Sequence, residues 1–385
     1  MNNELESLSA TLREMYATDN FIPLHEPSFR GREKELVVDC IESGWVSSVG
    51  QYVNQFEELL AQKVGVNYAV ATVNGTAALE LMLLSLGVGP GDCVLCPDLS
   101  FVATAAAICH IGAEPIFIDV ENERFGMCPT ALQEFLETST EYRDGQTFLK
   151  ESNKPIKACL VMHNVGFPVL WDELSRLCRA AGITILEDAA EALGSAYNGQ
   201  VWGSFGKAGI LSFNGNKVMT TGGSGAFVTN DEALAVKARY LATTAKCKHP
   251  YRYEHDEIGY NFIMPNINAA MGVAQLETLE ETLALKRSQA QHIRERLKEL
   301  SFAAFLEPDD GYNHWFNAVK LIGATADEVI PLPADLKIMA RPIWSSISEM
   351  KPYKNFVRGV ITNSPRLANT VICLPNGVSP RSLEA

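Results

Sequence analysis

The chain has 385 residues and a formal charge of −14 at pH 7, with acidic residues spread along its length. This length has room for two or three domains and for a large core. The acidic balance argues against a general nucleic-acid binder, which needs a basic surface, and against a polybasic membrane anchor. No run of about 18 apolar residues is present, and residues 1–6 lack the basic and apolar regions of a signal peptide. We therefore expect a cytoplasmic protein with no nucleic-acid or membrane partner.

Nine cysteines are present, and Cys93 and Cys96 are spaced like one half of a zinc or redox motif. They lie in an apolar run that predicts a strand, and residues three apart on a strand point to opposite faces. Two such side chains cannot easily share a metal ion or a disulfide. We therefore predict buried, reduced cysteines and no metal site.

After a polar N-terminal arm, residues 1–22, the predicted large domain 23–245 alternates short β-rich runs with helical ones. Apolar residues at helical spacing, such as Leu79, Met82 and Leu83, mark the helices. The expected strands cover residues 68–72, 93–96, 115–119, 158–162, 183–186, 209–213 and 226–229. Because several of these runs are continuously apolar, helices should cover both faces of the sheet. The alternation predicts an α/β fold with a mostly parallel, seven-stranded sheet.

The sequence changes character near residue 245. A polar, aromatic stretch at 246–253 predicts a long loop, and a helical region follows from about residue 268 to 300. A strand near residues 317–322 and a proline-rich end come next. These features predict a smaller α+β C-terminal domain over residues 246–385.

The segment from Asn74 to Leu79 joins the first predicted strand to the first amphipathic helix. Gly75 permits a sharp turn there, and the backbone N–H groups at a helix start have no partner within the helix. Together with the positive end of the helix dipole, they form an anion site that suits a phosphate. An ordinary strand–helix turn capped by Thr76 is the alternative, and the segment alone does not separate the two.

Two carboxylates, Glu187 and Asp188, end an apolar strand at the edge where open α/β sheets bind ligands, and Glu191 follows. A carboxylate desolvated by the sheet requires a cationic partner, whereas a solvated helix N-cap is the alternative. Lys217 lies in a loop rich in glycine, serine and asparagine between two apolar strands. Such a lysine offers a nucleophilic amine, and an exposed lysine in a flexible loop is the alternative.

Taken together, these three features fit pyridoxal 5'-phosphate. This cofactor needs a phosphate site, a carboxylate that keeps its pyridine nitrogen protonated, and a lysine that binds it as a Schiff base. Phe101 offers a flat ring for stacking, with simple core packing as the alternative. The spacing of a Walker-type phosphate loop is absent. The Rossmann glycine fingerprint is also absent, which argues against a nicotinamide oxidoreductase.

On these motifs the chain resembles a fold-type-I, pyridoxal-phosphate-dependent nucleotide-sugar aminotransferase of the DegT family. The resemblance covers nearly the whole chain and rests on residues 44–50, 74–79, 100–104, 187–191, 212–217, 259–262 and 266–272. Within the family, the enzymes that aminate C4 of UDP-4-keto-6-deoxy-N-acetylglucosamine are the most similar, at residues 24–27, 187–191, 212–217 and 341–344.

The resemblance implies a role for each candidate residue. Lys217 would bind the cofactor and then move a proton between the substrate and the cofactor, while Asp188 would hold the pyridine nitrogen. The other cofactor contacts would be Gly75, Thr76 and Ser212 at the phosphate, Phe101 on the ring and Glu191 near the ring hydroxyl. Asn261 would reach the cofactor phosphate of a neighbouring subunit, which implies a homodimer with shared active sites. The substrate contacts would include Trp45, Asn216 and Arg341, the last with a surface salt bridge as its alternative.

The implied reaction is a ping-pong transamination in which L-glutamate supplies the amino group and a nucleotide-linked ketosugar receives it. An aminotransferase for a different ketosugar, aminated at C3 or linked to dTDP or GDP, is the first alternative. A sugar dehydratase is disfavoured because relatives of that kind replace the lysine that this chain keeps. A cofactor-binding regulator is disfavoured because no basic patch or spare domain is present.

Two departures from the family pattern bear on the substrate rather than on the cofactor. Ile263 lies where the family commonly has arginine, which removes a cation. Phe167 and Trp171 interrupt a stretch that would lie beside the cofactor ring. His163, at the end of an apolar strand, is expected to be a hydrogen-bonded core residue rather than a catalyst.

Overall fold

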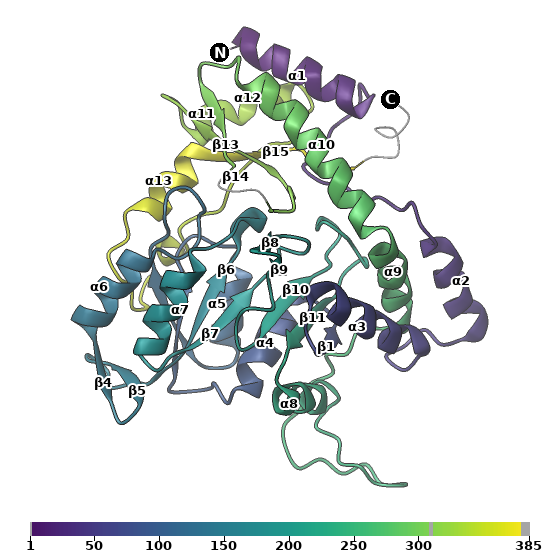
Figure 1. The fold of residues 1–385 in the computed structure, drawn as a ribbon, viewed down its shortest axis with the longest axis vertical. Helices are drawn as coiled ribbons and strands as arrows, with labels where there is room; N and C mark the ends of the chain where they lie inside the picture. The colour runs from purple at the N-terminus through teal and green to yellow at the C-terminus, as the bar shows by residue number, and fades with distance from the viewer. Residues whose placement is uncertain (1, 308–310, 379–385) are drawn as a thin grey trace.

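A seven-stranded sheet lies at the centre of the computed structural model, which describes residues 2–307 and 311–378 (Figure 1). Its strand order is β1-β11-β10-β7-β6-β2-β3. The strands are β1 (Tyr68–Thr72), β2 (Cys93–Pro97), β3 (Glu114–Ile118), β6 (Ile156–Met162), β7 (Thr184–Asp188), β10 (Gly209–Ser212) and β11 (Gly225–Thr229). All neighbours are parallel except β11, which is antiparallel to both β1 and β10. The predicted strands and the mostly parallel sheet are confirmed, with ends that differ by at most two residues.

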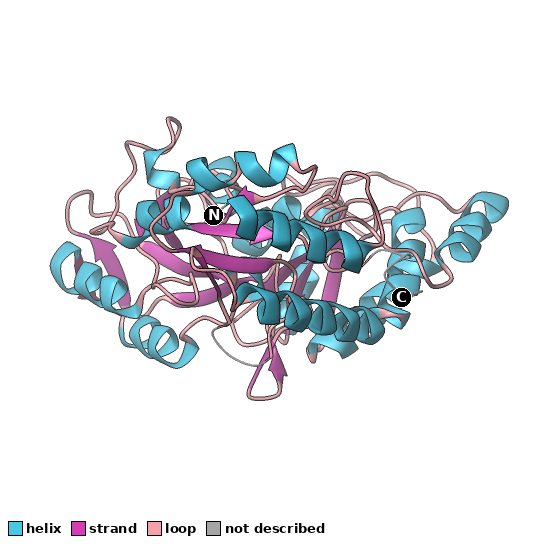
Figure 2. Ribbon diagram, turned by 90° about the horizontal axis from the view of Figure 1, so that it is seen from above, coloured by secondary structure: helices cyan, strands magenta, loops and turns pink. Residues whose placement is uncertain are grey.

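Helices pack on both sides of this sheet, as Figure 2 shows. They are α3 (Gln51–Val64), α4 (Gly75–Ser85), α5 (Ala103–His110), α6 (Pro129–Ser139), α7 (Trp171–Ala180) and α8 (Glu232–Ala242). Helix α9 (Asn266–Glu277) packs on α3, and α2 (Glu33–Ser43) packs on α9. Every residue of β2 and β11 is buried. Continuous apolar strands form here because both of their faces are removed from water.

A smaller antiparallel sheet has the order β12-β13-β15-β14. Its strands are β12 (Ala303–Phe305), β13 (Asn317–Leu321), β14 (Arg341–Pro342) and β15 (Val371–Leu374). Helix α1 (Asn2–Tyr16) packs against α10 (Leu279–Leu297) beside this sheet (Figure 1). The shared core includes Leu12 of α1 and Ile293 of α10. The first residues, expected only as a polar arm, therefore form a helix with a buried apolar side, and the division into domains stays a prediction.

The predicted helical region over residues 268–300 is two helices, α9 and α10, with Thr278 between them. The prediction also lacked two short hairpins and several short helices. These are β4 (Thr140–Arg143) with β5 (Gln146–Leu149), β8 (Ala196–Tyr197) with β9 (Gln200–Val201), the helices α11 (Ala326–Val329), α12 (Pro331–Asp335) and α13 (Asn363–Thr370), and the 3₁₀ turns η1 (Asn164–Gly166) and η2 (Ile347–Glu349).

Cys93 and Cys96 are both buried on β2, as predicted, and none of the nine cysteines forms a disulfide. Burial raises the pKa of the Cys96 thiol well above its usual range, which keeps the thiol protonated. Within the described residues, no helix combines the length and apolarity needed to cross a bilayer.

Candidate active site

A cavity of about 250 Å³ opens at the carboxyl ends of the parallel strands. We call it the lysine cavity, because Lys217 lines it. The structure brings most of the predicted site residues together there, namely Gly75, Thr76, Phe101, Asp188, Glu191, Ser212, Asn216 and Lys217. The other lining residues include Thr104, Trp315 and Trp344, to which no role was assigned.

The start of α4 forms one wall of the lysine cavity. Asn74 caps this helix, since its Oδ1 accepts the backbone N–H of Ala77 at 2.7 Å, so the alternative with Thr76 as the cap is wrong. A Cβ on Gly75 would lie 3.1 Å from the Cβ of Ser212, a contact so tight that a larger residue would push Ser212 away, so glycine suits this close approach. The first-turn amides and the nearby hydroxyls of Thr76 and Ser212 together make an anion-binding donor set.

Asp188 ends β7 and is 2% exposed, which excludes the solvated-cap alternative. The hydroxyl of Thr104 donates to Asp188 Oδ2 at 2.7 Å, and the N–H of Ala190 donates to Oδ1 at 3.2 Å. Burial raises the pKa of Asp188, whereas these two hydrogen bonds and the charge of Lys217 act in the opposite direction. The carboxylate is therefore fixed in orientation and beside the cavity.

Glu187, the neighbouring carboxylate, is buried with different partners. It accepts the backbone N–H groups of Gly203, Phe205 and Gly206 at 2.6–2.8 Å. Its Oε2 lies 3.1 Å from Nε2 of His163, whose ring packs 4.3 Å from that of Trp202. Glu187 thus fixes a loop, and the prediction that His163 is a hydrogen-bonded core residue is confirmed.

Lys217 lies with its Nζ 3.4 Å from Oε1 of Glu191. Its side chain is 12% exposed, so the alternative of an exposed lysine in a flexible loop is wrong. The other carboxylate oxygen of Glu191 accepts the N–H of Val165 at 2.8 Å. Burial raises the pKa of Glu191, and the positive charge of Lys217 opposes that shift.

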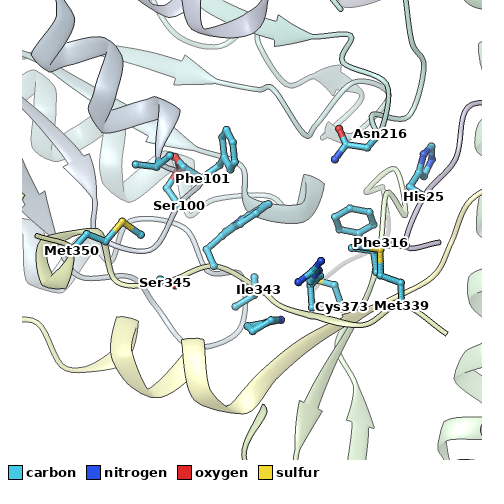
Figure 3. A pocket seen from close by; sticks show the side chains of 15 residues that line it. His25, Ser100, Phe101, Asn216, Phe316, Met339, Ile343, Ser345, Met350 and Cys373 are labelled. Carbon is cyan, nitrogen blue, oxygen red and sulfur yellow. Dashed lines mark hydrogen bonds between the residues drawn. The ribbon is translucent and has the colours of Figure 1, made fainter. Parts of the chain in front are cut away.

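A second cavity of about 470 Å³ adjoins the lysine cavity and shares Phe101, Asn216 and Trp344 with it. We call it the adjoining cavity. Figure 3 shows Phe101 and Asn216 on one side of it and Ile343, Met339 and Cys373 on the other. Phe101 is 49% exposed with its ring 5.4 Å from that of Trp344, so the core-packing alternative is wrong. Arg341 also lines this cavity.

Two predicted residues lie outside both cavities of the single chain. Trp45 is 57% exposed and lines a separate hollow with Tyr52 and Asn266. Asn261 is exposed and pairs with Thr243. Their substrate and cross-subunit roles stay predictions.

The departures from the family pattern are packed into the core. Ile263 is buried and pairs with Thr72 of β1. Phe167 stacks 5.6 Å from Phe125, and Trp171 packs against Phe205. None of these apolar side chains lines the lysine cavity.

The DegT/DnrJ/EryC1/StrS aminotransferase family matches residues 27–381. The chain belongs to this family. EpsN of Bacillus subtilis (strain 168) is 39% identical over 329 residues, which cover 85% of this chain and 82% of that protein. GDP-perosamine synthase of Escherichia coli O157:H7 is 36% identical over 336 residues, or 86% of this chain and 87% of that one. The structure of DesI with its TDP-sugar product has a TM-score of 0.82 and 28% identity, and covers 93% of this chain and 88% of its own.

The predicted fold-type-I architecture is confirmed, and the chain is a pyridoxal-phosphate-dependent nucleotide-sugar aminotransferase. The lysine cavity fits the cofactor of this family. Its helix start and two hydroxyls suit a phosphate, its buried carboxylate suits a protonated pyridine nitrogen, and its amine reaches the space between them.

The additional residues differ in how far the sequence indicated them. Thr104 lies in the 100–104 motif, and its hydroxyl suited a carboxylate partner. Trp344 ends the phrase at residues 341–344, whereas Trp315, which enters from the segment before β13, carries no local signal.

Proposed function

We propose that this aminotransferase transfers the amino group of L-glutamate to C4 of UDP-4-keto-6-deoxy-N-acetylglucosamine, as a cytoplasmic homodimer with shared active sites. The observation that carries the proposal is the continuity of the two cavities through Phe101, Asn216 and Trp344. A cofactor-sized space thereby opens directly into a larger space for a sugar.

The chain's residues divide the work of such a reaction. The bound cofactor supplies an electron sink for the negative charge that develops on the substrate carbon. Asp188 keeps the pyridine nitrogen protonated, and Lys217 moves the proton at the reacting carbon as a general acid–base. Glu191 lies beside the lysine amine and balances its charge when the amine is free.

The remaining contacts orient the cofactor. Gly75, Thr76 and Ser212 would hold the phosphate at the start of α4, where the helix end favours negative charge. Phe101 would cover one face of the ring. These groups do not react, and they hold the reacting carbon at a fixed distance from Lys217.

The adjoining cavity supports a deoxygenated, acetamido-bearing sugar. Its walls include Leu24, Phe316, Met339, Ile343 and Met350, which suit methyl groups rather than hydroxyls. Arg341 is exposed at this cavity and suits a diphosphate. Because Ile263 is apolar and buried, it supplies no positive charge for a diphosphate in this acidic protein. The guanidinium of Arg341 is therefore important for binding one.

A GDP-linked 4-keto-6-deoxy sugar is the second candidate substrate. The GDP-perosamine synthases of Escherichia coli O157:H7 and Vibrio cholerae are 36% and 35% identical to this chain. The same cavities would serve a GDP sugar if the nucleotide lies outside them.

Spectroscopy of the purified protein separates these candidates. L-glutamate should bleach the visible band of the bound cofactor, and UDP-4-keto-6-deoxy-N-acetylglucosamine should restore it. The 3-keto isomer and the GDP-linked 4-keto sugar should restore it much more slowly. Faster recovery with the GDP sugar would reassign the substrate, and a colourless protein that pyridoxal phosphate leaves unchanged would refute the function.

A further inference from the structure

Trp315 lies directly under the catalytic lysine, although it comes from the segment before β13. Its side chain is fully buried, and Nζ of Lys217 lies 4.1 Å from the centre of its ring. Its indole N–H donates to the backbone carbonyl of Asn216 at 2.6 Å. One side chain therefore holds both the lysine amine and the peptide immediately before the lysine.

Trp315 is itself held in place by two main-chain hydrogen bonds. Its backbone carbonyl accepts Nζ of Lys286, which is fully buried on α10, at 3.2 Å. Its backbone N–H donates to Oδ1 of Asn313 at 3.0 Å. These bonds fix the main chain of Trp315, and rotation of its buried side chain away from Lys217 would break the indole hydrogen bond to Asn216.

The same segment holds the other partner of the lysine. Nδ2 of Asn313 donates to the backbone carbonyl of Glu191 at 2.7 Å, and Oε1 of Glu191 lies 3.4 Å from the lysine Nζ. The amine thus lies between an aromatic face and a carboxylate whose positions are set together. A cation over an aromatic face is attracted to it, and a long lysine side chain otherwise samples many rotamers.

We propose that Trp315 is a positioning residue for Lys217, which holds the free amine at the place where it meets the cofactor or the substrate carbon. This inference rests on the role of Lys217 in the proposed function. By this inference, a residue from the C-terminal part of the chain helps to position Lys217, which lies in a loop between two strands of the large sheet.

The test measures attachment of pyridoxal 5'-phosphate to the apoenzyme, before any sugar is present. Attachment joins the lysine nitrogen to the aldehyde carbon and releases one water molecule, and the visible band reports its rate. Borohydride trapping followed by peptide mass spectrometry locates the attachment. Rates are compared over a range of pH, so that a change in the fraction of reactive amine is separated from a change in its placement.

We expect Trp315→Leu, which removes the ring and the indole N–H, to slow attachment roughly tenfold. Trp315→Phe keeps a ring and loses only the hydrogen bond to Asn216, so it should slow attachment about threefold. Trp171→Phe, which removes a partly buried indole outside both cavities, should match the wild type. Binding of pyridoxine 5'-phosphate, which has no aldehyde, should be equal in all of these proteins by equilibrium dialysis.

Attachment in Trp315→Leu within twofold of the wild type would overturn the proposal, as would a loss that the analogue's binding fully explains. If Trp315→Leu does not fold, Trp315→Phe decides, and a wild-type rate in that variant overturns the proposal. Lys217→Ala must show no attachment. Persistent attachment there would instead refute the site assignment on which the proposed function depends.

Discussion

Glu187, Asp188 and Glu191 are buried carboxylates in one short segment, and each is satisfied in a different way. Glu187 is taken up by backbone N–H groups, Asp188 by Thr104 and Ala190, and Glu191 by Val165 and Lys217. A buried carboxylate without partners would cost several kcal/mol. The partners therefore decide which of these groups is structural and which faces the cavity.

Replacing Lys217 by alanine tests the residue that the site depends on most. Turnover should fall by about 10²–10⁴-fold or more, because the positioned acid–base group is lost. The phosphate and ring contacts remain, so the cofactor should still bind noncovalently. Absorbance and dialysis measure this binding, and a variant that retains turnover would contradict the role of Lys217.

Thr104→Val tests the orientation of Asp188. The substitution removes a hydrogen bond that lowers the pKa of Asp188, so that pKa should rise further above its usual value. Catalytic efficiency should fall roughly tenfold or more, since a hydrogen bond to a charged group contributes about 1.5–3 kcal/mol. The loss should grow as the pH decreases, because more of the carboxyl becomes protonated.

Thr104→Ser is the matched control, as it keeps the hydroxyl, and its pH profile should remain close to that of the wild type. Equal profiles for the valine and serine variants would show that the hydroxyl does not act on Asp188.

At the level of elements, α10 carries a lysine into the core. Nζ of Lys286 donates to the carbonyls of Trp315 and Asn376, which connects α10 to the loop before β13 and to the end of the chain. Burial lowers the pKa of Lys286 to about 7 from 10.5. The position of α10 thus depends on an amine that is costly to charge.

Lys286→Met makes this cost measurable as a dependence of stability on pH. Between about pH 7 and 10.5 the unfolded chain binds a proton at Lys286 that the folded chain lacks, so the wild type gains stability as the pH rises. The free energy of unfolding, relative to Lys286→Met, should increase by about 1.4 kcal/mol per pH unit at most. Below pH 7 the difference should be flat.

Urea unfolding at several pH values measures this difference, since ionisable groups common to both proteins largely cancel. Lys320→Met, on the solvent-facing side of β13, is the matched control and should show no such slope. A difference between wild type and Lys286→Met that does not change with pH would contradict the lowered pKa.

On the scale of the whole molecule, the proposed shared site makes a prediction about mixed dimers. Lys217→Ala alone should be inactive, and Asn261→Ala alone should be weakened through poorer cofactor binding. A mixed dimer would contain one site with both native residues if Asn261 acts on the neighbouring subunit. Co-expression with two affinity tags should therefore restore up to half of the wild-type activity.

Activity of the mixed dimer no greater than the mean of its parents would show that Asn261 acts within its own chain or not at all. Sedimentation of the same preparations reports whether a dimer forms.

The sequence by itself determined the large sheet and the candidate reacting groups of this protein. Strands such as β2 and β11 are buried on both faces, so their continuous apolar runs could be predicted as strands without knowing which strands lie beside them. Lys217, Asp188 and the start of α4 were also identifiable, because each combines an unusual residue type with a strand end or a glycine turn.

Only the tertiary structure decided which distant residues complete the site. The pattern around Trp315 predicts a strand nearby and contains nothing that names Lys217 as its neighbour. Helix α1 is similar, since its polar composition hid an apolar side that packs on α10. Local propensity acts over a few residues and reveals elements and strand ends. Contacts between segments about a hundred residues apart are selected by the packing of the whole chain, which no local pattern records.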